Sequence, residues 1–255
     1  MLRPYFCHKH LLTSIPLTPY NVPMNILILV AGTNDPSNSN TLADAFMEGV
    51  RSFGGDMHLE KIRLKDIELA HFTLQHYDPT YPQEEVFKSL QKKIEEADGI
   101  LIATPIWNFG VPAHLKNLID RMGSFGLDRE THSRGTFRGK PFFLIFTGGS
   151  PLAAWTGLQR KTTSFLPVGL KYFGASVAGT YYEPRCLPRR QAGTKGRGVF
   201  GLVVHERPGS LACVQEAGCT FAQIVKKFKD TGKLPLEQAL LVRIYKIGQM
   251  IVKKL

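Results

Sequence analysis

The sequence predicts an α/β protein in which a five-stranded, doubly wound parallel sheet lies between two layers of helices, a three-layer αβα arrangement. Apolar runs of strand length alternate with amphipathic helix patterns over about 160 residues, as in a series of β/α units. The runs at 99–106 and 141–146 are apolar without alternation, which is typical of strands covered on both faces. An eight-stranded barrel needs about 250 residues, so the length of this region favours the doubly wound sheet.

The elements can be assigned in order from periodicity and from helix start and stop signals. Asn40 or Thr41 is expected to cap the first helix. Pro112 suits the first turn of the third helix, because that position needs no N–H, and His114 beside it is expected only to cover the surface. The predicted elements are strands at 26–30, 57–64, 99–106, 141–146 and 176–182, and helices at 42–53, 83–97, 113–122 and 158–173.

The C-terminal quarter carries the excess of positive charge. Residues 186–255 hold 13 Lys or Arg and four Asp or Glu, whereas 24–185 are balanced at 17 of each. We expect a loop at 186–210 and a helix at 214–232 that closes the domain and ends at Gly232. No helix-turn-helix or basic aromatic pattern occurs in this quarter, so no nucleic-acid partner is expected.

An appended amphipathic basic helix is predicted at 236–255, within a C-terminal unit of 233–255. Its apolar residues recur at spacings of 4, 3, 4 and 4, as on one side of a helix. They are Leu240, Ile244, Ile247, Ile251 and Leu255. Such a helix could pack on its own domain, pair across a dimer, or make a peripheral contact with an anionic membrane surface.

The remaining features bound the class of protein. Residues 1–23 are expected to be a disordered leader or to precede the true start at Met24, so the main domain is 24–232. The four cysteines lack metal-site spacing, which predicts a reducing, cytoplasmic environment and no cysteine-based metal site. No apolar run reaches the roughly 18 residues that a membrane-spanning helix needs.

Three loops of unusual composition, 32–41, 105–112 and 147–155, follow the first, third and fourth predicted strands. In a doubly wound sheet, ligands bind outside the carboxyl ends of the strands. The first loop leads into a helix N-terminus, which favours anions. It has neither the GxGxxG of a dinucleotide turn nor the lysine of a Walker loop, so its neutral donors suit a phosphomonoester. Alternatively, it is only a capped helix after a turn at Asp35 and Pro36.

The other two loops are suited to a flat ligand. Trp107 and Phe109 directly follow a buried strand and could line an aromatic group, although aromatic residues at such positions also serve core or lid packing. Gly148 and Gly149 have no side chains, so a planar ring could approach the backbone there. The alternative for this third loop is a flexible connection from strand to helix.

Residues 25–183 resemble the NAD(P)H-dependent FMN reductase family, which has the flavodoxin-like fold. The resemblance lies in Gly32 and Thr33 followed by 37–41, and it continues in 104–112 and in the LKNLIDR run at 115–121. Family members usually have Tyr where Trp107 stands. The cysteine cluster of the iron–sulfur relatives is missing from 65–82, so a cluster is not expected.

The resemblance implies bound FMN, with NAD(P)H as co-substrate, and an oxidoreductase that passes electrons to a quinone, a flavin or a similar small acceptor. The FMN phosphate would lie on the first loop and the isoalloxazine against the other two. The implied cofactor-binding residues are Thr33, Ser37, Asn38, Ser39, Asn40, Thr41, Pro105, Ile106, Trp107, Asn108, Phe109, Gly110, Thr147, Gly148, Gly149 and Ser150. No catalytic acid or base is implied, because the cofactor carries the chemistry.

Two other functions remain open at this stage. One is a redox-inactive flavodoxin-like module that docks to a partner or membrane through the basic C-terminal helix. The other, an electron-carrying flavodoxin, is disfavoured because such carriers are usually acidic. We also expect a homo-oligomer, either a dimer or a tetramer. The choice between NADH and NADPH and the identity of the acceptor are not encoded in these patterns.

Overall fold

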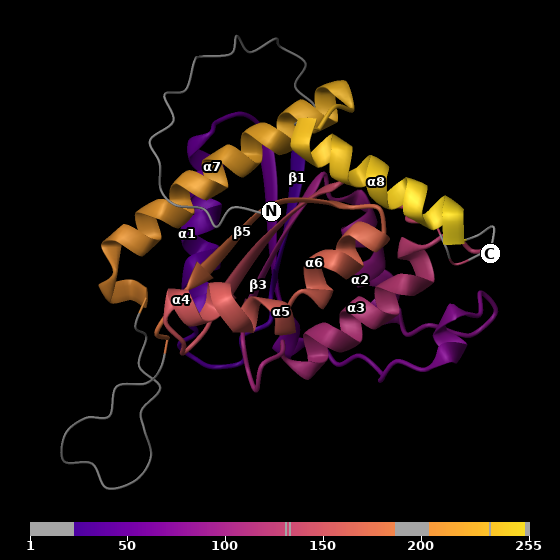
Figure 1. Ribbon diagram of the computed structural model, residues 1–255, viewed down its shortest axis with the longest axis horizontal. Coiled ribbons are helices and arrows are strands. Elements are labelled where there is room, and N and C mark those ends of the chain that lie inside the picture. Colours follow the sequence, from indigo (N-terminus) through magenta and orange to yellow (C-terminus); the bar gives the residue numbers. More distant parts are fainter. Residues whose placement is uncertain (1–22, 131, 133, 187–203, 235, 253–255) are drawn as a thin grey trace, which may run out of the picture.

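The computed structural model describes residues 23–130, 132, 134–186, 204–234 and 236–252; the predicted leader therefore lies outside the described residues, apart from residue 23. Its five strands form one parallel sheet in the order β2-β1-β3-β4-β5 (Figure 1). The strands are β1 (Met24–Val30), β2 (Met57–Arg63), β3 (Gly99–Pro105), β4 (Pro141–Thr147) and β5 (Ser176–Glu183). This arrangement confirms the predicted doubly wound sheet.

Helices cover both faces of the sheet and make two hydrophobic cores (Figure 1). On one face, Phe46 and Phe221 pack against Phe143 of β4, with ring centroids 5.0 and 6.0 Å from it. On the other, Phe87 and Phe125 pack 6.0 Å apart beneath the sheet. The first face is covered by α1 (Asn38–Ser52) and α7 (Pro208–Thr231), and the second by α2 (Glu85–Glu96), α3 (Ala113–Gly126) and α6 (Phe165–Tyr172).

The helix predicted at 158–173 is wrong as one continuous element. A π-helical turn, η3 (Trp155–Gln159), lies between the short helices α4 (Leu152–Ala154) and α5 (Arg160–Thr162). The chain then starts again as α6, because Pro167 has no N–H for the carbonyl of Thr163 and fits only the first turn of a new helix. The other short elements are η1 (Leu64–Asp66), η2 (Leu74–Tyr77) and η4 (Val204–Glu206).

Several helix ends differ from the predictions. Ser37 caps α1, with its side chain accepting a hydrogen bond from the Asn40 N–H, so Asn40 and Thr41 lie inside the helix. Since Pro208 suits a first turn, α7 begins there, inside the segment predicted as a loop; residues 187–203 of that loop lie outside the described residues. Gly232 ends α7 with a left-handed φ of 64°, as predicted.

Two glycines bring α1 and α7 into backbone contact. A Cβ on Gly49 would overlap the carbonyl of Gln215, and a Cβ on Gly218 would overlap the carbonyl of Phe46. The two helices therefore pack more closely than any side chain at these positions would allow. Glycine normally weakens a helix interior, so its presence here reflects this close approach.

An ion pair between a buried arginine and a partly exposed glutamate fixes α3 to the segment before α2. The Arg121 side chain is fully buried, contacts Glu84 at 2.5 Å, and lies over the Phe87 ring at 4.0 Å from its centroid. This hydrogen bond lowers the pKa of Glu84 to about 2. Gln83 accepts a further hydrogen bond from Arg121 at 2.5 Å. The arginine of the LKNLIDR run therefore supports the fold at this position.

The last helix, α8 (Leu236–Val252), lies against β5 and α6, and Gln249 Nε2 donates to the Tyr172 carbonyl at 2.8 Å. Its predicted apolar residues Leu240, Ile244, Ile247 and Ile251 are all exposed, and Leu255 lies outside the described residues. Among the residues that the structure describes, no helix is both long and apolar enough to cross a bilayer.

Candidate functional site

The three predicted loops meet at the carboxyl edge of the sheet and are hydrogen-bonded to their neighbours. Ile106 N donates to the Thr147 carbonyl at 2.8 Å and so joins the second loop to the third. His114 Nε2 lies 2.9 Å from the Ala31 carbonyl and joins the start of α3 to the first loop. The expectation that His114 only covers the surface is wrong: the ring is half-buried and holds two site segments together.

Gly32 and two serines form the floor of the first loop. The Ser37 and Ser39 hydroxyls are 3.0 Å apart and both are buried. A Cβ on Gly32 would overlap both hydroxyl oxygens, so the small cradle between the strand end and the helix start exists only because residue 32 is glycine. Its polar lining and the positive end of the α1 dipole suit an anion.

The other predicted donors of this loop already have partners within the chain. Asn38 Oδ1 accepts from Val204 N at 3.2 Å, and Thr41 Oγ1 donates to the Ser37 carbonyl at 3.1 Å. Asn40 Nδ2 donates to Asp44 at 3.0 Å, whereas its Oδ1 is buried with no hydrogen-bond partner among the described residues. The hydroxyls of Ser37 and Ser39 and the loop backbone are thus the groups nearest the cradle.

An ion-pair cluster that was not predicted holds the outer part of the first loop. Asp35 pairs with Arg63, the last residue of β2, at 2.5 Å, and with Lys65 of η1. The hydrogen bond from Lys65 is the largest cause, followed by that from Arg63, of a lowered pKa of the Asp35 carboxyl. The sequence shows the turn at Asp35 but not its partners, because they lie about 30 residues further along the chain.

The second loop is a tight turn that presents two aromatic rings. Trp107 and Gly110 exchange both backbone hydrogen bonds at 2.9 Å, and Asn108 and Phe109 between them have φ of 48° and 65°. These are the angles of a type I′ turn, and a positive φ is uncommon for phenylalanine. Trp107 is 39% and Phe109 61% exposed. Pro105 and Ile106 lie half-buried beneath them.

The third loop is bound to the end of β5. Gly148 N donates to the Glu183 carbonyl at 3.0 Å, and the Tyr182 hydroxyl donates to the Ser150 carbonyl at 2.8 Å. A Cβ on Gly148 would come within 2.7 Å of that hydroxyl, so this glycine makes room for Tyr182. Gly149 and Ser150 are half-buried and lie nearer the surface than Thr147. A planar ring could therefore approach the backbone at Gly149 rather than at Gly148.

Behind this loop lies a buried carboxylate that sequence reasoning missed. Glu183 is buried and accepts hydrogen bonds from Arg207 at 2.5 Å, Tyr181 at 2.6 Å and Ser210 at 3.1 Å. Burial, together with the hydrogen bond to Glu183, raises the pKa of the Tyr181 phenol. The cluster ties β5 to the start of α7.

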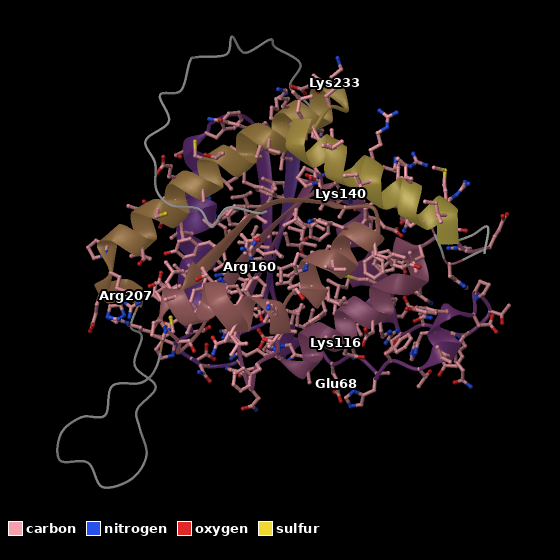
Figure 2. The ribbon with its side chains drawn as sticks, in the orientation of Figure 1. Glu68, Lys116, Lys140, Arg160, Arg207 and Lys233 are labelled. Carbon is pink, nitrogen blue, oxygen red and sulfur yellow. The ribbon has the colours of Figure 1, made fainter. Side chains whose placement is uncertain are left out.

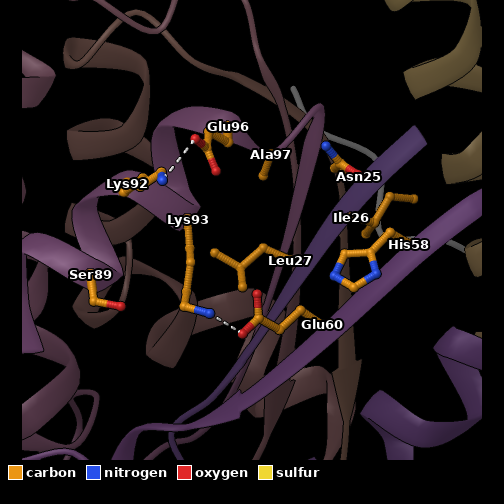
Figure 3. A pocket seen from close by; sticks show the side chains of 10 residues that line it. All are labelled: Asn25, Ile26, Leu27, His58, Glu60, Ser89, Lys92, Lys93, Glu96 and Ala97. Carbon is orange, nitrogen blue, oxygen red and sulfur yellow. Dashed lines mark hydrogen bonds and ion pairs between the residues drawn. The ribbon is translucent and has the colours of Figure 1, made fainter. Parts of the chain in front are cut away.

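Elsewhere, a groove of about 310 Å³ beside β1, β2 and α2 contains none of the predicted site residues (Figure 3). Its two lysines are both paired, Lys93 with Glu60 and Lys92 with Glu96. No group of three His, Cys, Asp or Glu able to hold a metal ion occurs within the described ranges. Within the described ranges, Cys186, Cys213 and Cys219 form no disulfide.

Among curated proteins, the chain is similar to an FMN-dependent NADH:quinone oxidoreductase of Cereibacter sphaeroides, with 35% identity over 124 residues, 44% of this chain and 63% of the relative. It is also similar to a subunit of the NADH:(hydroxy)cinnamate reductase of Vibrio ruber, with 35% identity over 97 residues, 38% of this chain and 44% of the relative. The chain thus spans about half the length of these curated relatives.

Solved structures share the fold at low identity. The NAD(P)H:quinone oxidoreductase from Methanothermobacter marburgensis is 20% identical with a TM-score of 0.56, covering 78% of this chain and 96% of that one. An FMN-dependent NADH-azoreductase from Bacillus anthracis, solved with FMN, is 17% identical with a TM-score of 0.56, covering 78% and 99%. The model of the family described as NADPH-dependent FMN reductase matches residues 24–179, which include all three loops. The chain belongs to that family.

Proposed function

We propose that this protein is an FMN-dependent NAD(P)H oxidoreductase that passes electrons from a nicotinamide cofactor to a small acceptor. Its membership of the NADPH-dependent FMN reductase family supports this proposal. The Cereibacter sphaeroides relative is named an FMN-dependent NADH:quinone oxidoreductase and the Bacillus anthracis structure an FMN-dependent NADH-azoreductase, and a quinone or a flavin is our candidate for the acceptor.

The observation that carries the proposal is the cradle at Gly32. It joins two buried hydroxyls to a helix N-terminus, and in the first turn of the same helix the Asn40 Oδ1 is buried without a hydrogen-bond partner among the described residues. This set fits the phosphate and ribityl hydroxyls of FMN: the hydroxyls and backbone suit phosphate oxygens, and the Asn40 oxygen can accept from a hydroxyl. No lysine or arginine is needed for a phosphate at such a helix end.

The other two loops fit a flat ring. We assign the isoalloxazine to the exposed rings and backbone of 105–110 on one side and to 147–150 on the other. Bound FMN supplies hydride and electron transfer, so the protein has to bind, orient and shield it. Trp107 and Phe109 would limit the access of water, and the bond between Ile106 and Thr147 would keep the two loops at a fixed separation.

The test is FMN binding by matched glycine variants. The purified protein should show a flavin absorbance spectrum and oxidise NADH or NADPH when FMN is supplied. Gly32→Val should lose FMN, because its side chain would occupy the serine cradle, whereas Gly209→Ala, with open space around it, should not. A folded wild-type protein that neither binds FMN nor oxidises NAD(P)H would refute the proposal and leave the redox-inactive module as the better explanation.

Two further features of this proposal concern assembly and location. We propose a homo-oligomer, a dimer or tetramer, which light scattering on the full chain would measure. The cytoplasmic environment remains a prediction.

A further inference from the structure

The outer side of α8 is an apolar surface that nothing in the described chain covers. Of the 13 exposed large hydrophobic residues in the described part of the chain, six lie in this one helix. Four of them follow helical spacing and so share a side. We call the six together the outer stripe of α8: Leu236, Leu240, Ile244, Ile247, Met250 and Ile251.

The helix is held with this stripe turned outward. Gln249, on the opposite side at 100° per residue, is the residue that bonds to Tyr172 beside α6. At the other end, the Leu234 side chain lies 3.1 Å from the Cβ position of Gly139, just before β4. The Gln249 hydrogen bond holds α8 against the domain on its inner side, so rotation that would bury the outer stripe would break this bond.

Positive charge accompanies the stripe. Arg243 and Lys246 are exposed, and at 100° per residue Arg243 projects within the apolar sector while Lys246 lies at its border. Lys233, just before the helix, is also exposed (Figure 2). The sequence of 236–255 contains four Lys or Arg and one Glu. An exposed apolar side bordered by cations is the composition of a helix that lies in a membrane interface.

We propose that the outer stripe of α8 docks on an anionic lipid surface. The stripe would enter the headgroup region, while the long side chains of Arg243 and Lys246 reach back to lipid phosphates. A second copy of the chain fits less well, because it would bring a surface of the same positive sign, with exposed Arg243 and Lys246, whereas an anionic lipid surface brings the opposite sign. Charge complementarity therefore selects the lipid.

The orientation leaves the candidate site free. Leu234, just before α8, contacts Gly139 ahead of β4, and Gln249 of α8 bonds to Tyr172 ahead of β5. The helix therefore lies toward the amino ends of the sheet, whereas the three loops lie at the carboxyl ends (Figure 1). Docking would present these loops to water. It requires neither bound flavin nor turnover, and it can be tested apart from the proposed function.

The test is co-sedimentation of the full chain with vesicles. One set contains phosphatidylcholine alone, and the other contains phosphatidylcholine with 30% phosphatidylglycerol, a fraction on the order of natural anionic lipid content. We expect binding to the anionic set only. The double variant Ile244→Asp/Ile247→Asp should lose this binding, and Arg243→Gln/Lys246→Gln should weaken it by roughly tenfold or more, since each cation near an anionic surface contributes about fivefold. Leu74→Asp, an isolated exposed leucine, is the matched control and should bind as wild type.

Other outcomes would overturn the proposal. One is that the wild type does not bind anionic vesicles. Another is that the Ile244→Asp/Ile247→Asp variant binds them as well as the wild type does. A third is that the wild type binds both vesicle sets equally. A wild-type dimer that becomes monomeric in the Ile244→Asp/Ile247→Asp variant without any vesicle binding by the wild type would identify a second copy as the partner of the stripe. Because the substituted residues are exposed, circular dichroism should show unchanged folding, so loss of binding can be assigned to the surface.

Discussion

Helices α7 and α8 follow each other in the chain and both carry a regular apolar side, yet only one of these sides is covered. In α7, Phe221 and Val225 are buried against α1 and β4, and Glu183 anchors the start of the helix through Arg207. In α8, the outer stripe is exposed, and a hydrogen bond from Gln249 helps to hold the inner side. The difference shows that periodicity identifies a helix and its apolar side but not what covers that side.

The largest effect that should separate the two helices comes from truncating one apolar residue in each. Phe221→Ala should lower the free energy of unfolding by about 3–5 kcal/mol, because it opens a cavity among tightly packed aromatic rings. Leu240→Ala should change it by less than about 0.5 kcal/mol, since this residue is 60% exposed. Urea unfolding followed by circular dichroism measures both. Equal losses would show that the outer stripe is covered in solution.

The next effect concerns the polar anchor of α7. Arg207→Met should cost about 3 kcal/mol, because it leaves the buried Glu183 carboxylate without its cation. Arg243→Met, on the exposed side of α8, is the matched control and should leave the unfolding midpoint unchanged. If both variants unfold at the wild-type midpoint, Glu183 is not held as a buried ion.

Replacing one glycine by alanine in each helix should have smaller effects on stability, and these should be of opposite sign in α7 and α8. Gly218→Ala should destabilise the protein by about 1–3 kcal/mol, since its Cβ would overlap the Phe46 carbonyl and push α1 away from α7. Gly248→Ala has open space around it and should stabilise α8 by about 0.5–1 kcal/mol. Thermal melts of the two variants provide the comparison; a stabilising Gly218→Ala would contradict the close approach of the helices.

The most gradual effect is the pH dependence of two buried groups at the end of β5, Tyr182 and Cys186. Burial, the main cause, raises the pKa of Tyr182 from 10.0 and that of Cys186 from 9.0, each to about 12. Groups with raised pKa values contribute stability that is complete below their ordinary values and is lost as pH rises toward the folded value. The free energy of unfolding should therefore fall between about pH 9 and 12. In the double variant Tyr182→Phe/Cys186→Ala it should fall less, as urea unfolding at a series of pH values would measure.

A variant truncated after residue 234 is the control for this pH effect. It lacks α8 but keeps Tyr182 and Cys186 at the end of β5. Its free energy of unfolding should therefore fall with pH between about pH 9 and 12 in the same way as that of the full chain. A flat profile in the full chain would mean that these groups are solvated rather than buried.

Much of the fold could be predicted from the sequence because it depends on local patterns. The strands β1, β3 and β4 are short apolar runs between turn residues, and right-handed crossovers together with the length of the region favour a doubly wound sheet. The three loops could be predicted to meet because parallel strands end at the same edge of a sheet. The break at Pro167 was missed, since apolar spacing continues across it and only the missing N–H marks a new helix.

The parts that could not be predicted are contacts between distant residues. Arg121 and its partner Glu84 are 37 residues apart in the sequence, and Arg207 and Glu183 are 24 residues apart. Asp35 is separated from its cationic partners by about 30 residues. The partners of Asn38 and Thr41 likewise become visible only in three dimensions. For the same reason, the exposure of the outer stripe of α8 could not be decided between packing and docking from its spacing alone.

The hydrogen bonds that join the three loops also have a kinetic consequence. His114 to Ala31, Ile106 to Thr147 and Gly148 to Glu183 connect four segments in series across the sheet edge. A segment in such a series cannot open alone without breaking a link to its neighbour, so the edge should open as one cooperative unit. Amide hydrogens along all four segments should then exchange with deuterium at a common rate, and a ligand bound at the edge should slow that rate for all of them together.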